Sequence, residues 1–265
     1  MPDFWSNQGT GLHHVGMKSA ARMIAITGHG DHQCELPLLW SLCSALVDLG
    51  YCVTVLDATM EEHNDEPGLE QMLDDAYWER DAPSSHASWS IIPATKGIRL
   101  ICQRATHKTP ALTALNGLFD NGEVVVIFAT ADILGKLLRD TGVEPLIAVS
   151  DKRMSLMTGY RALKTMLLDG NIRPIIATVA NESNLTPGIP SPTAGRHLLD
   201  CAENFLGCSL STPLSVAISA QERYSPDMNR LILRMLATAK ELDQPIHTAP
   251  WSQRAPVHEQ ISGSH

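Results

Sequence analysis

Short, strongly apolar stretches alternate with helix-length segments along most of this chain of 265 residues. This alternation limits the folds open to the chain more than any other feature. Residues 124–128 and 174–179 are apolar at nearly every position, so both faces of each strand would be apolar, as in parallel strands covered by helices on each side. The pattern predicts an α/β fold with a doubly wound, mainly parallel sheet. Its ligand crevice would lie at the carboxyl ends of the strands.

The same pattern predicts the individual elements. The expected strands are 23–28, 52–57, 98–102, 123–128, 145–149, 173–179 and 213–218. The expected helices are 36–49, 68–76, 108–118, 132–141, 153–168, 192–206 and 227–241. We expect one domain over 23–249, a flexible N-terminal tail at 1–22 and a loose C-terminal tail at 250–265. Residues 59–90 interrupt the alternation and predict an insertion with a short helix, over or beside the crevice.

The net charge, the length of the apolar runs and the cysteine pattern limit which class of protein this chain can belong to. The formal net charge of −9 argues against sequence-independent binding of nucleic acid through a strongly basic face. No apolar run reaches the length of a membrane span, and the N-terminal segment lacks the apolar core of a signal peptide. The six cysteines follow no small-domain disulfide pattern and predict reduced, buried thiols. We therefore expect a cytoplasmic protein.

The first predicted strand runs into a loop that stands where a phosphate-binding loop would be. The loop contains Gly28 and Gly30, and a predicted helix follows it. In a phosphate-binding loop, glycines let backbone N–H groups approach the phosphates, a lysine reaches them, and a Ser or Thr hydroxyl holds magnesium. Here the corresponding positions hold Glu35, Leu36 and Pro37, and Pro37 suits the first turn of a helix. The scaffold is kept and the phosphate-binding chemistry is absent.

Several segments, in this order, resemble the deviant Walker A ATPases of the MinD/ParA family. The loop and helix just described, followed by a strand that ends in Asp57, resemble the nucleotide-binding end of that family. Residues 145–164 are similar to the strand and helix that follow its second switch. Asn181 stands where the family carries the Asn that reads the adenine, and 193–207 is similar to a late helix of the flagellar-number regulator FlhG.

The N-terminal tail makes this resemblance more specific. The segment Asn-Gln-Gly-Thr-Gly-Leu-His, residues 7–13, resembles the Asp-Gln-Ala-x-x-Leu-Arg motif at the start of FlhG. In that family ATP drives dimerisation, and the motif stimulates the signal-recognition-type GTPase FlhF. The resemblance implies partner contacts through Asn7, Gln8, Leu12 and His13, among which Gln8 and Leu12 keep the residue types of the motif.

Compared with that family, this chain lacks the residues that bind phosphate and Mg²⁺. The lysine of the loop falls on Glu35. For unit charges about 4 Å apart at an effective dielectric near 20, a carboxylate there would repel a phosphate by roughly 4 kcal/mol. The Walker B acid falls on Phe128, which cannot ligate Mg²⁺ through water, and the second acid of an Asp-x-Asp motif falls on Thr59. We therefore expect no catalytic residue and neither ATP nor Mg²⁺ as a cofactor.

The remaining residues of this region are predicted to form a vestigial nucleotide site. Its members are Gly28, Gly30, Glu35, Leu36, Asp57 and Asn181. For Asp57 and Asn181 the simpler interpretation is that each tethers the end of a strand.

The leading hypothesis is a catalytically inactive MinD/FlhG-like protein. It would act as a regulatory binding partner in the control of flagellar number and placement, through an FlhF-type GTPase or another polar-organelle protein. We expect a monomer or a dimer that does not respond to nucleotide. Two alternatives stay open. One is a divergent, active ATPase that supplies a lysine from Lys96 or Lys136. The other is a MinD-like accessory factor of exopolysaccharide or pilus secretion.

Two further patterns have competing interpretations. The loop crowds four metal-ligand types together at His29, Asp31, His32 and Cys34, but their spacing matches no closed zinc site, so no metal is predicted. Residues 228–242 form an amphipathic segment that we expect to pack on the sheet as the last helix. Peripheral contact of this segment with the inner face of the membrane is the less favoured alternative.

Overall fold

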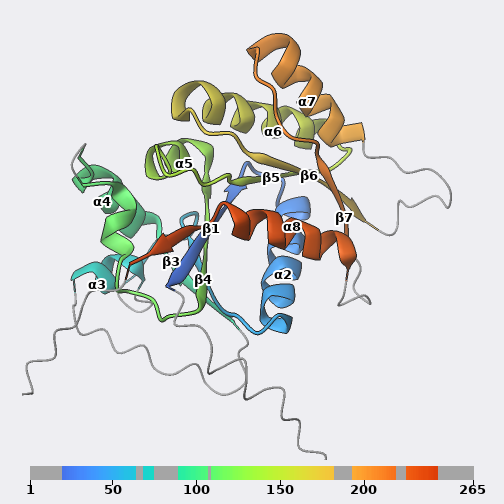
Figure 1. Ribbon diagram of the computed structural model, residues 1–265. Coiled ribbons are helices and arrows are strands. Elements are labelled where there is room, and N and C mark those ends of the chain that lie inside the picture. The colour runs from blue at the N-terminus through green and yellow to red at the C-terminus, as the bar shows by residue number, and fades with distance from the viewer. Residues whose placement is uncertain are drawn as a thin grey trace, which may run out of the picture.

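The computed structural model describes residues 20–63, 68–74, 89–106, 109–181, 193–218 and 225–243. The strands are β1 (Ala21–Gly28), β2 (Cys52–Asp57), β3 (Trp89–Pro93), β4 (Glu123–Thr130), β5 (Leu146–Val149), β6 (Ile175–Asn181), β7 (Leu214–Ile218) and β8 (Lys240–Leu242). The helices are α2 (His32–Asp48), α3 (Leu69–Asp74), α4 (Thr95–Arg104), α5 (Ala131–Leu137), α6 (Arg153–Thr165), α7 (Thr193–Leu206) and α8 (Pro226–Ala237), with short helical turns η1 (Ala111–Leu115) and η2 (Met166–Gly170). Figure 1 shows a central sheet with helices on both sides, which confirms the predicted fold class.

The described strands form one sheet in the order β3-β2-β4-β1-β5-β6-β7. Each neighbouring pair along this path is parallel. Only β8 runs antiparallel, against the first residues of β1. The chain leaves β1 toward β2 on one side of the sheet, and it leaves β4 toward β5 on the other. This change of direction places a crevice at the carboxyl ends of β1 and β4, where ligands bind in folds of this type.

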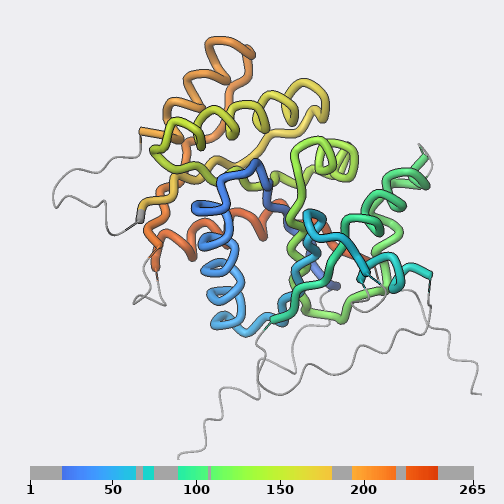
Figure 2. The backbone as a smooth tube through the Cα atoms, turned by 180° about the vertical axis from the view of Figure 1, so that it is seen from behind, coloured from blue at the N-terminus to red at the C-terminus, as the bar shows by residue number. Residues whose placement is uncertain are grey.

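The core lies in two layers because the side chains of each strand alternate between the two faces. In β1, Met23 and Ala25 point into one layer, and Ile24 and Ile26 point into the other. The second layer is covered by α2 and α8, which contact each other. Helices α3 to α7 cover the first layer. Figure 2 shows α2 from behind, in front of the sheet that it covers.

The predicted strand at 98–102 is wrong, and so is the predicted helix at 108–118. Residues 98–102 lie in α4, where Ile98 and Ile101 are buried three positions apart on one helical face. The edge strand is instead β3, which begins at the end of the segment 59–90 that is predicted as an insertion, and it pairs in parallel with β2. The short helix of that segment, α3, packs on α4. The predicted helix 108–118 is only the turn η1.

Two helix boundaries also differ from the prediction. Helix α2 begins at His32 instead of near residue 36, so Glu35 lies in its first turn and Pro37 lies inside the helix. Pro37 therefore removes an N–H that a regular helix would use. Helix α8 ends at Ala237 and is followed by β8, so the predicted helix 227–241 is too long. Strand β1 begins at Ala21, two residues before the predicted strand 23–28.

The apolar face of α8 packs on the sheet, as expected. Met228, Leu231, Ile232 and Met235 are all buried. None of the helices in the described part of the chain combines the length and the apolar character needed to cross a lipid bilayer. The cysteines all carry free thiols, but only two of them, Cys34 and Cys43, are buried as expected.

Candidate functional site

A pocket of about 480 Å³ opens at the carboxyl ends of β1 and β4. Its walls come from the loop after β1, the first turn of α2, the junction of β4 and α5, and one face of α6. This is the position that the strand order assigns to the ligand crevice. Of the predicted vestigial residues, Gly28, Gly30 and Glu35 line it.

Glu35 turns its carboxylate back into the loop that precedes its helix. The side chain is fully buried. The backbone N–H of His29 donates to Glu35 Oε1 at 2.7 Å, and the N–H of Asp31 donates to the same oxygen at 3.2 Å. Gly30 lies between these two donors with φ of 99°, a left-handed conformation that glycine adopts without steric cost. The carboxylate thus occupies a position in which backbone N–H groups before a helix would otherwise bind an anion.

The two donors differ in kind. Asp31 directly precedes α2, and its N–H contact with a glutamate of the first turn is like that of a capping box. His29 stands two residues further out, in the loop itself. Glu35, for which the sequence predicts only repulsion of phosphate, is thus also an acceptor for two backbone N–H groups of the loop.

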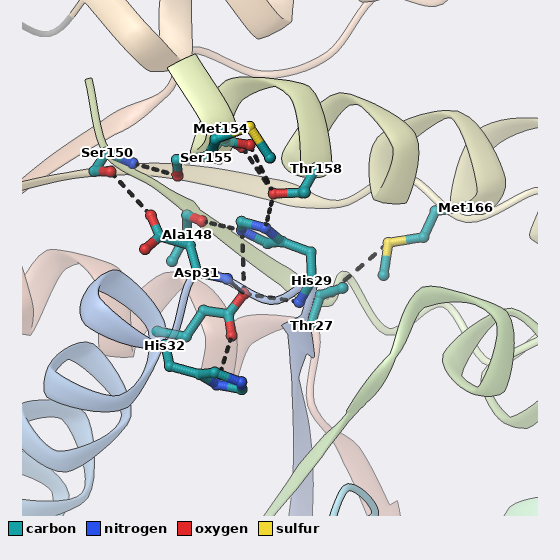
Figure 3. Close-up of polar contacts among 11 residues, drawn as sticks. Thr27, His29, Asp31, His32, Ala148, Ser150, Met154, Ser155, Thr158 and Met166 are labelled. Atoms are coloured by element: carbon teal, nitrogen blue, oxygen red, sulfur yellow. Dashed lines mark hydrogen bonds and ion pairs between the residues drawn. The ribbon is translucent and has the colours of Figure 1, made fainter. Parts of the chain in front are cut away.

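The imidazole of His29 fixes the loop against two distant elements (Figure 3). Its Nε2 lies 2.6 Å from the carbonyl oxygen of Ala148, and its Nδ1 lies 2.8 Å from Thr158 Oγ1. Because a carbonyl oxygen only accepts, Nε2 carries the hydrogen in that contact. The same Nε2 lies 3.3 Å from Glu35 Oε1, and the ring is 2% exposed. His29 thus joins the loop to β5, to α6 and to the buried carboxylate.

A second set of contacts ties the loop to the turn between β5 and α6. Ser150 Oγ donates to Asp31 Oδ2 at 2.9 Å. Lys152 Nζ donates to the side-chain oxygen of Gln33, at the start of α2. These contacts tie the loop and the start of α2 to β5, to α6 and to the turn between them.

The other oxygen of Glu35 has a different environment. Oε2 is buried and accepts no hydrogen bond from the residues that the structure describes. The Nδ1 atom of His32 is 3.8 Å away, beyond hydrogen-bond distance, and the His32 side chain is 68% exposed. A buried acceptor without a donor is costly and uncommon in folded proteins.

Phe128 fills the space on the other side of the loop. It lies near the end of β4 and is 1% exposed. A Cβ placed on Gly28 would lie 3.1 Å from Cζ of its ring. An aromatic ring thus packs against the loop where the resemblance would place the Walker B acid, and Gly28 is needed for this close approach.

Of the other predicted residues that the structure describes, Asp57 and Leu36 do not line the pocket. Asp57 Oδ1 accepts hydrogen bonds from the N–H and the hydroxyl of Thr59, at 2.8 and 2.6 Å, so it tethers the end of its own strand. Leu36 is exposed and does not line the pocket. Asn181 ends β6 with its backbone opposite Ile218. The tail residues Asn7, Gln8, Leu12 and His13, and the predicted C-terminal tail, lie outside the described residues.

The pocket contains a cation that the sequence analysis missed. Among the described residues that line it, Arg161 is the one Lys or Arg. It lies on α6 with Thr158, Ala162 and Thr165, and the i, i+3, i+4, i+7 spacing of this set could have been found in the predicted helix 153–168. The two lysines considered earlier do not line the pocket.

The four potential metal ligands of the loop face different parts of the structure. His29 and Asp31 are engaged by β5 and α6, as described, and His32 faces outward. Burial, with the nearby charges of Asp31 and Glu35, raises the pKa of the Cys34 thiol. Within the described part of the chain, no group of three or more His, Cys, Asp or Glu side chains is placed to hold a metal ion.

The fold is similar to solved structures of partition and cell-division ATPases. A plasmid partition protein from Borrelia burgdorferi is 10% identical, with a TM-score of 0.50 over 83% of this chain and 99% of that chain. A ParA family ATPase from Chlorobium tepidum is 13% identical, with a TM-score of 0.45 over 82% and 99%. The cell division protein MinD from Aquifex aeolicus is 13% identical, with a TM-score of 0.42 over 83% and 99%.

At such low identity this likeness shows the fold alone. The chain has the fold of ParA/MinD-type P-loop proteins, with a mostly parallel sheet flanked by helices. No family model matches the chain, and no curated protein matches it.

Proposed function

We propose that this chain is a ParA/MinD-fold protein that does not hydrolyse ATP and acts as a regulatory binding partner in the control of flagellar number and placement. The observation that supports its inactivity is the buried carboxylate of Glu35, which accepts the loop N–H groups of His29 and Asp31. A nucleotide phosphate would have to displace this side chain and would meet a charge of the same sign.

Phe128 supports the same proposal from the other side of the loop. Its ring packs against Gly28 at the position where the resemblance places the acid that would hold a hydrated Mg²⁺. Asp132, at the start of α5, accepts instead from Thr130 Oγ1 at 2.6 Å.

Calorimetry of the purified protein with Mg·ATP and Mg·ADP tests this half of the proposal. We expect no binding in the micromolar range. Micromolar affinity in the wild type that is lost in an Arg161→Ala variant would favour the divergent ATPase instead, because Arg161 is the Lys or Arg of the described pocket lining. Micromolar affinity in both proteins would also overturn the inactive site.

The partner half of the proposal is an FlhF-type GTPase, bound through the N-terminal tail. Its support is the resemblance of residues 7–13 to the FlhG motif, in which Gln8 and Leu12 are retained. A Gln8→Ala/Leu12→Ala double variant should lose binding to an FlhF-type GTPase domain in a pull-down or by calorimetry. Thr10→Ala is the matched control, since Thr10 occupies a variable position of the same motif. Undiminished binding by the double variant would refute the role of the tail.

We further propose that the protein works in the cytoplasm as a monomer or as a dimer that is indifferent to nucleotide. The closed loop supports this state, because no γ-phosphate would be present to gate assembly. The buried apolar face of α8 supports packing over peripheral membrane contact. Light scattering coupled to size exclusion should give the same mass with and without Mg·ATP, and a nucleotide-dependent change in mass would contradict it.

A further inference from the structure

We propose that the loop of residues 28–31 and the start of α2 still form a binding site for tetrahedral oxyanions such as phosphate, and that Glu35 fills this site as an internal ligand. The inference rests on the proposed loss of nucleotide binding and goes beyond it. If the anion site no longer exists, removing the Glu35 side chain should not allow an anion to bind. If the site is intact but filled by Glu35, removing the side chain should allow an anion to bind.

The donors of the site belong to the backbone and not to Glu35. The N–H groups of His29 and Asp31 point at one oxygen, and Gly30 between them has the positive φ that lets them converge. Helix α2, of 17 residues, adds the positive end of its dipole at the same place. Contacts of His29 with Ala148 and Thr158 hold the loop from outside. These features remain when the carboxylate is removed.

The unpaired oxygen of Glu35 is an independent sign that the carboxylate stands in for another group. Oε2 is buried and accepts no hydrogen bond, although the side chain is 0% exposed. A carboxylate that only caps a helix would be expected to use both oxygens on N–H groups. Glu62 does so at the start of α4, where it accepts from Lys96 N–H at 2.6 Å and Gly97 N–H at 2.8 Å. The described donors around Glu35 match only one of its two carboxylate oxygens.

The neighbouring pocket gives an external anion access to this place. Glu35 is part of the wall of the pocket of about 480 Å³. Truncating the side chain would join the space of the carboxylate to that pocket. His32, with Nδ1 at 3.8 Å from Oε2, is then an available donor for a further oxygen of a phosphate. Glu62 does not line this pocket.

The test is rescue of a Glu35→Ala variant by inorganic phosphate. Thermal unfolding is followed in sodium phosphate and in sodium chloride of equal ionic strength, so that general salt effects cancel. At about ten times the dissociation constant, phosphate should raise the Tm of Glu35→Ala by about 3 °C above its value in chloride. Wild type should show no such difference, because its site is filled. Calorimetry should detect phosphate binding to the variant only.

Glu62→Ala is the matched control. It also removes a buried glutamate that accepts two N–H groups near the start of a helix, so its stability should be as low in phosphate as in chloride. The proposal is wrong if phosphate and chloride act alike on Glu35→Ala. It is equally wrong if phosphate stabilises wild type or Glu62→Ala to the same extent.

A variant that does not fold in chloride can be refolded in phosphate, and recovery in phosphate alone supports the proposal. If neither salt allows folding, Glu35→Gln decides, because it keeps the shape of the side chain and loses the charge. Amide hydrogen exchange at His29 and Asp31 should then be faster than in wild type, with other loops unchanged; unaltered exchange there would contradict an anion role for Glu35.

Tight binding of ATP to wild type would overturn the proposed function without affecting the comparison of phosphate with chloride.

Discussion

Two buried glutamates in this protein accept hydrogen bonds from backbone N–H groups at the starts of two helices, and their hydrogen-bond patterns differ. Glu62 places one oxygen on Lys96 N–H and the other on Gly97 N–H, both in the first turn of α4. Glu35 places a single oxygen on His29 N–H and Asp31 N–H, which precede α2, and leaves the other without a hydrogen bond. Both side chains are almost completely buried.

The difference separates a structural cap from a converted ligand site. Around Glu62 the donors and acceptors match one to one, and the Lys96 ammonium also donates to the Glu62 carbonyl oxygen at 2.9 Å. Around Glu35 the donors match only half of the carboxylate, and the pocket adjoins it.

Truncation of each glutamate in chloride buffer should give the largest effects. Glu35→Ala should lower the free energy of unfolding by about 3 kcal/mol, because two N–H groups lose their acceptor and the buried His29 ring loses its close contact with the carboxylate. Glu62→Ala should lower it by about 2 kcal/mol, since it orphans two N–H groups and no buried ring. Urea unfolding followed by circular dichroism measures both. A cost at Glu35 well below that at Glu62 would show that the loop does not depend on its carboxylate.

Adding a methyl group beside each glutamate probes how tightly the two helix starts are packed. A Cβ on Gly97 would lie 2.7 Å from Leu69 Cβ and 2.8 Å from the backbone nitrogen of Glu70, so Gly97→Ala should cost about 2 kcal/mol. A Cβ on Gly28 would meet only the edge of the Phe128 ring, at 3.1 Å, so Gly28→Ala should cost about 1 kcal/mol. In a Phe128→Leu background the cost of Gly28→Ala should shrink further. An equal cost in both backgrounds would mean that Phe128 is not the limiting contact.

Glutamine at the two positions tests the hydrogen-bond pattern itself. Both oxygens of Glu62 face N–H donors, so Glu62→Gln would turn its NH₂ group toward another donor and should cost about 1.5 kcal/mol. Glu35→Gln can keep its carbonyl oxygen on His29 and Asp31 and turn its NH₂ group to the unpaired side, so it should cost about 1 kcal/mol or less. The ratio of each glutamine variant to its alanine variant is the measurement. A smaller ratio at Glu62 than at Glu35 would contradict the distinction.

The smallest expected effect lies at alkaline pH. Burial first, then the charges of Asp31 and Glu35, raises the pKa of the Cys34 thiol, and burial raises the pKa of Cys43 to about 12, from an ordinary value of 9.0. Above pH 9 the unfolded chain loses these protons while the folded protein keeps them, so the free energy of unfolding should fall as pH rises from 9 toward 12. Glu35→Gln should make this fall slightly shallower, and Glu62→Gln should leave it unchanged. A slope that responds equally to both variants would mean that Glu35 does not act on Cys34.

Much of the fold could be predicted because its strongest signals are local. Strand β2 has the predicted bounds, 52–57, and the central strands lie close to theirs, since fully buried strands are apolar runs. The edge strand β3 was missed because it is only half buried and its pattern is short. The apolar content of residues 98–102 predicts a strand, whereas burial of Ile98 and Ile101 on one face in the tertiary structure makes them helical.

For the candidate site, the sequence predicts only which residues of a nucleotide site are missing. Glu35 and Phe128 were recognised as replacements for a lysine and an acid, which needs no coordinates. The direction of the Glu35 side chain could not be predicted, because it depends on α2 beginning at His32 and on a positive φ at Gly30. The surroundings of His29 could not be predicted either. They involve Ala148 and Thr158, which are 119 and 129 residues away in the chain.

The sequence by itself determined that this chain builds a doubly wound sheet with a glycine loop at its centre, and that the loop lacks the lysine and hydroxyls of a nucleotide site. Apolar runs and residue identities are enough for that. Only the tertiary structure decided what the loop binds in their place. Backbone N–H groups have no sequence signature, and an acceptor reaches them only when the helix start, the loop and two distant elements hold Glu35 among them.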